Sequence, residues 1–280
     1  MSSIADLRGK VAVVTGGGSG FGAALCREFA GAGMAVATLD IDRAAAETTA
    51  TTLGDLDVPT MAVGVDVGDT ESVLAAAADV ESALGGCDVL CANVGVQQFG
   101  AIERLTDDDW TWVLNVNVLG TIRTVSAFLP LLRARDGFRQ IALTASSGVL
   151  VPGVRLGAYQ TSKFAVVGFG ETLRLELADE GIGVTVVFPA GMTTRHLESS
   201  AAARPVEKGE WVLLPDDVEV MMASRAVGPE HVAAPEHAAR NVVADLVANE
   251  PYIVTHGAYR PEYHRRLAAI EAAFDRTERT

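Results

Sequence analysis

The chain has 280 residues, of which 49% are hydrophobic and 21% are charged, and its formal net charge is -14 at pH 7. This hydrophobic content is enough to bury one large core, and it argues against a disordered chain. The acidic balance disfavours a nucleic acid or an anionic membrane as a partner, because both require a basic surface.

Short apolar runs alternate with helix-period segments along the chain. The predicted strands are 11–15, 35–40, 60–66, 89–92, 140–144 and 184–188, and the predicted helices are 20–32, 43–53, 70–84, 107–133 and 158–179. Strands that are apolar throughout are typical of a parallel sheet covered by helices on both faces. The predicted class is α/β: a single Rossmann-type domain, 1–280, with a doubly wound parallel sheet. Its site is expected at the carboxyl ends of the strands.

The alternation breaks at residues 192–234, where prolines are scattered and polarity is mixed. A connection this long inside a compact domain is usually functional, so we predict a substrate lid. The apolar residues that favour an apolar underside for this lid are Trp211, Leu213, Leu214, Met221 and Met222. The alternative is that they cap the core. A helix at about 235–248 follows, and residues 256–280 are predicted to form a helical tail.

A glycine-rich loop, Thr15–Gly22 (TGGGSGFG), directly follows the first predicted strand and opens a helix. Glycine lets phosphates approach backbone N–H groups and permits the positive φ angles of such a turn. Asp40 ends the second strand, and together the two features indicate dinucleotide binding. The Asp40 carboxylate can bind an adenosine ribose and repels a 2′-phosphate. No Lys or Arg lies in residues 16–22, and Arg43 is the only nearby exception. The sequence therefore predicts NAD rather than NADP.

Tyr159 and Lys163 are four residues apart in a predicted helix, so they share one face. A free tyrosine has a pKa of about 10, and a nearby ammonium lowers it by about 1–3. The tyrosine then becomes a usable acid and base. Ser146, thirteen residues upstream of Tyr159, offers a hydroxyl to hold the substrate oxygen. The chain has only three lysines and otherwise uses arginine for positive charge, so Lys163 is favoured as a functional residue.

The remaining composition indicates an intracellular protein. Cys26, Cys87 and Cys91 do not form a secreted-type disulfide framework, and the first ten residues carry three charges in place of an apolar signal segment. We therefore expect a cytoplasmic protein with buried thiols. No apolar stretch of about 18 residues predicts a membrane span, and no histidine spacing predicts a metal site.

Together these features resemble the short-chain dehydrogenase/reductase (SDR) family, in its principal single-domain branch with TGxxxGxG and YxxxK motifs. Besides those motifs, the resemblance is carried by Asp40, Asp66-Val67, Ala92-Asn93-Val94-Gly95, Asn117-Val118-Leu119-Gly120, Ser146 and Pro189–Thr194. It is close from about residue 7 to 194 and looser to about 254. Ala92, Val94 and Ala190 depart from the usual residues, and the chain ends in a helix rather than in a glycine-rich strand.

The resemblance implies a role for each matching residue. Tyr159 would be the general acid/base, and Lys163 would hold the nicotinamide ribose and lower the pKa of Tyr159. Ser146 would orient the substrate oxygen, and Asn117 would support a water relay. The implied cofactor contacts are Gly16, Ser19, Gly20, Phe21, Gly22, Asp40, Asp66, Val67, Asn93, Gly95, Tyr159, Lys163, Pro189, Gly191, Met192 and Thr194. The implied reaction is hydride transfer between an alcohol carbon and the nicotinamide.

The expected substrate pocket is mainly apolar. Its predicted lining is Val96, Phe99, Leu150, Val154 and Trp211, beside Ser146 and Tyr159. This predicts an NAD-dependent oxidoreductase acting on a hydrophobic secondary alcohol or ketone, aryl or cyclic. The lid and tail are similar to those of bacterial aryl-alcohol Cα-dehydrogenases. The alternatives are a 3-oxoacyl-thioester ketoreductase and a non-catalytic cofactor-sensing protein. From the resemblance we expect a homodimer or homotetramer, assembled through helices 107–133 and 158–179.

Overall fold

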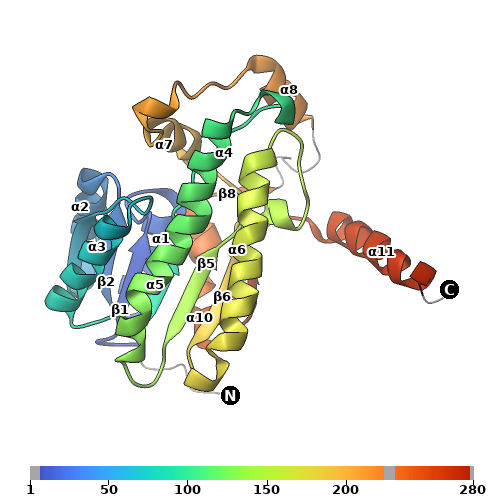
Figure 1. The fold of residues 1–280 in the computed structure, drawn as a ribbon. Coiled ribbons are helices and arrows are strands. Elements are labelled where there is room, and N and C mark those ends of the chain that lie inside the picture. The colour runs from blue at the N-terminus through green and yellow to red at the C-terminus, as the bar shows by residue number, and fades with distance from the viewer. Residues whose placement is uncertain (1–6, 224–230, 278–280) are drawn as a thin grey trace.

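The computed structural model describes residues 7–223 and 231–277 (Figure 1). Seven strands form one fully parallel sheet in the order β3-β2-β1-β4-β5-β6-β9. Their bounds are β1 Val11–Thr15, β2 Ala35–Asp40, β3 Thr60–Gly64, β4 Val89–Ala92, β5 Gln140–Thr144, β6 Gly183–Phe188 and β9 Tyr252–Val254. The strand order reverses between β1 and β4, which is where such folds open a ligand site. The doubly wound α/β fold predicted from the sequence is confirmed.

Helices connect the strands and cover both faces of the sheet. They are α1 Gly20–Gly31, α2 Arg43–Thr52, α3 Thr70–Leu84, α4 Asp107–Leu114, α5 Gly120–Arg133, α6 Gly157–Glu176, α7 His196–Ala202, α8 Pro215–Met222, α9 Pro235–Ala239, α10 Val242–Val247 and α11 Arg260–Thr277. Short strands β7 (Gly191–Met192) and β8 (Val232–Ala233) pair separately. Two features differ from the sequence prediction. The edge strand β9 was not among the predicted strands, and the helix expected at 235–248 is split into α9 and α10.

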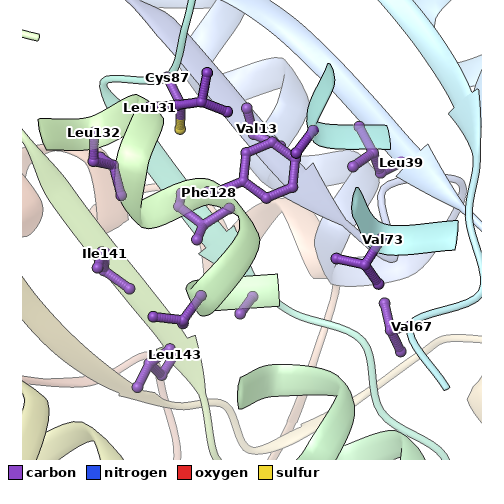
Figure 2. Close-up of a cluster of buried hydrophobic side chains, with 14 of the residues drawn as sticks. Val13, Leu39, Val67, Val73, Cys87, Phe128, Leu131, Leu132, Ile141 and Leu143 are labelled. Carbon is purple, nitrogen blue, oxygen red and sulfur yellow. The ribbon is translucent and has the colours of Figure 1, made fainter. Parts of the chain in front are cut away.

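The core consists of two hydrophobic layers on opposite faces of the sheet. Alternate residues of β1 point to different layers: Val11 and Val13 lie with α3, α5 and α6, whereas Ala12 and Val14 lie with α1 and α10. Figure 2 shows part of the first layer, where Phe128 of α5 lies among side chains from the strands. Because both faces are covered, most strand residues are apolar. The buried polar exceptions on the strands are Thr15, Thr38, Gln140 and Thr185. The three cysteines are free and buried, as expected, and burial raises the pKa of the Cys26 thiol to about 12.

The long helix predicted at 107–133 is interrupted by a π-helical turn, Asn115–Leu119, between α4 and α5. The turn contains Asn117, whose side chain is fully buried. Extra residues in such turns often mark functional positions. By length and composition alone Asp107–Arg133 is apolar enough to cross a membrane. Within the domain, 44% of its most apolar stretch is buried.

The predicted lid lies over one end of the sheet and carries α7 and α8 (Figure 1). Two buried ionic contacts attach it to the body. Arg204 pairs with Asp109 Oδ1 at 2.7 Å, and its guanidinium lies 5.2 Å from the ring centroid of Trp112. Asp217 of α8, only 2% exposed, pairs with both Arg104 and Arg155.

The lid underside is apolar only in part. Met221 is buried and Trp211 is half-buried, whereas Leu214 is exposed. Residues 224–230 of the predicted lid lie outside the described residues, and of Met222 only the backbone is described. The predicted helical tail is present as α11. This helix projects from the body, and the Arg266 guanidinium connects it to the Val149 carbonyl at 2.5 Å (Figure 1).

Candidate active site

A cavity of about 1540 Å³ lies at the carboxyl ends of the central strands, between the glycine-rich loop and the lid. A pocket for one drug-sized ligand is usually about 300–1,000 Å³, so this cavity has room for a dinucleotide and a substrate together. Every residue predicted to contact a cofactor lines it, from Gly16 in the first loop to Thr194 at the start of the lid.

The glycine-rich loop forms one wall at close backbone range. Gly16 and Gly20 have φ angles of +67° and +51°, which favour glycine. A Cβ atom on Gly22 would lie 2.0 Å from the Gly16 carbonyl oxygen, so no side chain fits there. The helix α1 begins at Gly20, and its first N–H groups have no partner within the helix. This cradle fits the diphosphate of a dinucleotide.

Asp40 stands beside this loop in a fixed orientation. Its Oδ2 accepts the Gly18 N–H at 2.9 Å, and its Oδ1 accepts the Asp42 N–H at 3.0 Å. Arg43 is exposed and forms an ion pair with Glu47 Oε1 at 2.9 Å. The carboxylate therefore lines the cavity, while the nearest basic residue in the sequence is engaged on the surface.

Hydrogen bonds connect the carboxyl ends of the central strands β1, β4 and β5 at the cavity. The backbone N–H of Asn93 donates to Thr15 Oγ1 at 3.0 Å, and Thr144 Oγ1 donates to Asn93 Oδ1, also at 3.0 Å. Thr194 lies above the same loop, since a Cβ atom on Gly20 would come within 3.1 Å of its methyl group. The lid therefore begins directly over the predicted cofactor position.

Ser146, Tyr159 and Lys163 meet at the cavity wall, as the motif spacing predicts. The Lys163 ammonium donates to the Thr144 carbonyl at 2.8 Å and lies 5.8 Å from the ring centroid of Tyr159. Ser146 Oγ accepts the Gly148 N–H at 3.1 Å, and this bond fixes the loop that carries the hydroxyl.

Asn117 lies behind this wall rather than in it. Its Oδ1 accepts the Val96 N–H at 2.8 Å, and its Nδ2 donates to the Val96 carbonyl and to Ser162 Oγ, both at 2.9 Å. Ser162 Oγ in turn donates to the Tyr159 carbonyl at 2.6 Å. In this structure Asn117 therefore positions the loop after β4 against the helix turn that carries Tyr159.

The predicted effect of Lys163 on Tyr159 is wrong for this geometry. Burial raises the pKa of Tyr159, and a hydrogen bond with Ser146 offsets only part of that increase. Burial also lowers the pKa of Lys163 to about 8. The physical reason is that both groups are removed from water, which disfavours the charged form of each.

The substrate side of the cavity differs in part from the prediction. Val96, Phe99, Ser146 and Tyr159 line it, but Leu150, Val154 and Trp211 do not. Leu150 packs against the core, Val154 is 49% exposed, and the Trp211 indole N–H donates to the Gln97 carbonyl at 2.9 Å. The lining residues that the sequence prediction missed include Gln97, Val151, Leu156, His196, His231 and Tyr259. Several come from the lid and the segment before α11, where no motif marks them.

Comparison with known proteins agrees with this geometry. The family model described as short chain dehydrogenase matches residues 10–205. A C alpha-dehydrogenase of Sphingobium sp. is 29% identical over 266 residues, which are 95% of this chain and 86% of that protein. A D-threitol dehydrogenase of Mycolicibacterium smegmatis is 35% identical over 189 residues, which are 67% of this chain and 72% of that protein. The crystal structure of an SDR protein from Burkholderia phymatum in complex with NAD is 28% identical, covers 96% of both chains, and has a TM-score of 0.85. The chain therefore belongs to the short-chain dehydrogenase/reductase family, and it is an oxidoreductase of that family.

Proposed function

We propose that this protein is an NAD-dependent dehydrogenase that transfers hydride between the nicotinamide and a hydrophobic secondary alcohol or its ketone, aryl or cyclic. One observation carries the proposal. Tyr159, Ser146 and Lys163 lie in the wall of one cavity whose other end is formed by the glycine-rich loop and Asp40. The match to a C alpha-dehydrogenase over 95% of the chain supports the alcohol class.

A nicotinamide dinucleotide held along the glycine-rich loop, Asp40 and Asn93 would supply the hydride acceptor or donor. The chain's own groups move the proton. During oxidation the phenolate form of Tyr159 accepts the proton of the substrate hydroxyl and becomes the phenol, and during reduction the phenol returns that proton to the substrate oxygen. The hydroxyl of Ser146 holds the same substrate oxygen. Asn117 fixes the positions of these groups through Val96 and Ser162.

The proposed preference for NAD over NADP rests on Asp40. Its carboxylate is held against the loop by two backbone N–H groups, and Arg43 is engaged with Glu47. A 2′-phosphate on the adenosine ribose would bring a second negative charge to this carboxylate. The repulsion between two charges ~4 Å apart is about 1 kcal/mol in water and ~4 kcal/mol at intermediate dielectric.

Replacing Tyr159 with phenylalanine tests the chemistry. Tyr159→Phe is expected to bind NADH as before and to lose turnover by ~10²–10⁴-fold, because it removes the proton-transfer group. Turnover is measured by nicotinamide absorbance with a panel of aryl, cyclic and aliphatic secondary alcohols. The matched control is Tyr252→Phe, which removes a hydroxyl that bonds Glu171 on the surface and should leave turnover unchanged. Equal turnover in Tyr159→Phe and the wild type would remove Tyr159 from the mechanism. A stronger reaction with a 3-oxoacyl thioester and NADPH would favour the ketoreductase alternative.

We also propose that the protein acts in the cytoplasm as a homodimer or homotetramer, with copies packing through α4, α5 and α6. Exposed apolar side chains in this region support the proposal: Leu175 and Phe164 of α6 are 80% and 36% exposed, and Leu119, in the π-helical turn before α5, is 47% exposed. Exposed apolar surface of this kind is typical of interfaces between protein chains.

A further inference from the structure

One polar side chain in the cavity has no place in the chemistry described so far. His196 is the first residue of α7, two positions after Thr194, and its half-buried imidazole lines the same cavity as Ser146 and Tyr159. It lies in the part of the lid that begins above the predicted nicotinamide position, close enough to Lys163 for the ammonium charge to act on the imidazole.

The position of His196 is fixed by the fold. Ser200 Oγ, which is buried, donates to the His196 carbonyl at 2.7 Å and accepts the Gln97 N–H at 3.1 Å. This hydroxyl joins the turn of α7 that carries His196 to the loop after β4. The backbone of His196 is thus attached to the cavity wall through a buried hydroxyl, and this attachment sets where the imidazole enters the cavity.

The imidazole nitrogens of His196 form no hydrogen bond with any of the residues that the structure describes. Two other histidines nearby differ, because His231 Nδ1 accepts the Ala258 N–H and both ring nitrogens of His256 bond to neighbours. Burial and the positive charge of Lys163 lower the pKa of His196 to about 4. The ring is consequently neutral at pH 7, with one N–H donor and one nitrogen acceptor free for a ligand.

We propose that His196 hydrogen-bonds a second oxygen of the substrate, so that the substrate is a secondary alcohol with a further hydroxyl group near the reacting carbon. The inference rests on the proposed dehydrogenase function and narrows its substrate class. A site that presents a polar group discriminates against analogues that cannot bond to it, because the group is then left desolvated and unpaired.

Two pairs of alcohols of matched size test the proposal. The pairs are 1-phenyl-1,2-ethanediol with 1-phenyl-1-propanol, and 1-phenyl-1,3-propanediol with 1-phenyl-1-butanol. In the wild type with NAD, kcat/KM is expected to be about tenfold higher for the diol of at least one pair, as one net hydrogen bond provides. His196→Leu should reduce that ratio to about one. His196→Asn, which keeps a hydrogen-bond donor and an acceptor, should retain part of the preference for the diol. His264→Leu, on the exposed helix α11, is the control and should keep the wild-type ratio.

The same four alcohols distinguish a failure of the His196 inference from a failure of the proposed dehydrogenase function. Dissociation constants of all four alcohols are measured by calorimetry on the protein saturated with NADH, so the diol preference is read without turnover. If the wild type oxidises none of the alcohols, the dehydrogenase proposal fails for this class, while the binding ratio still decides the role of His196. A wild-type binding ratio near one in both pairs, absence of binding by every probe, or an unchanged ratio in His196→Leu would each overturn the inference.

Discussion

Asp40 is expected to decide the choice between the two nicotinamide dinucleotides, and Asp40→Asn tests this with almost no change in shape. The carboxylate accepts the N–H groups of Gly18 and Asp42 at 2.9 and 3.0 Å, so its position beside the loop is set by the backbone. The variant removes the negative charge and keeps one oxygen as an acceptor. It should therefore tolerate a 2′-phosphate that the wild type repels.

The expected change follows from the charge and the lost hydrogen bond. Removing a repulsion of about 1 to 4 kcal/mol, the values for charges ~4 Å apart in water and at intermediate dielectric, corresponds to roughly tenfold to a thousandfold in selectivity. One of the two backbone N–H groups loses its acceptor, which costs roughly 1 kcal/mol because part of this region is open to water. NAD binding should consequently weaken by only a few-fold, and most of the change should be a gain with NADP.

The assay is kcat/KM for NAD and for NADP with one alcohol, supported by dissociation constants for NADH and NADPH from fluorescence titration. Asp42→Asn is the matched control, because it removes the same charge two residues away, and asparagine can still cap α2 as Asp42 does through the Ala45 N–H. The NADP/NAD ratio should rise in Asp40→Asn and change little in Asp42→Asn. An unchanged ratio in Asp40→Asn, or an equal rise in both variants, would refute the reasoning.

Two further predictions concern the acid/base group and the lid. Ser146→Ala removes the hydrogen bond that lowers the pKa of Tyr159, so that pKa should rise further. The rising limb of the pH profile for alcohol oxidation should then move to higher pH, with Ser147→Ala as the control; a shift to lower pH would contradict the assignment. Asp217→Asn should destabilise the lid by about 1 kcal/mol, because the two arginines that lose their anionic partner are themselves partly exposed to water. In limited proteolysis the lid of Asp217→Asn should be cleaved faster than the lid of the control Asp216→Asn, in which an exposed residue is changed. The affinity for NADH should be the same in both variants. Equal cleavage rates would show that Asp217 does not attach the lid to the body.

The sequence by itself determined the architecture and the position of the chemistry. Strands buried on both faces are mainly apolar, and a phosphate-binding turn needs glycine where the backbone approaches closely, so both can be read from residue order alone. The glycine-rich loop, Asp40 and the Tyr159-Lys163 pair are local patterns of this kind. All of them line the cavity in the folded chain.

Only the tertiary structure decided the surroundings of these groups. Spacing places Lys163 on the same helix face as Tyr159, but burial, a property of the whole fold, raises the pKa of the phenol. Likewise, Trp211 is apolar enough for a pocket, yet its indole N–H donates to the Gln97 carbonyl and its side chain does not line the cavity, while His196 is brought in by the fold of the lid. Contacts between segments a hundred residues apart leave no periodic signal in the sequence, and for that reason the substrate side could not be predicted in detail.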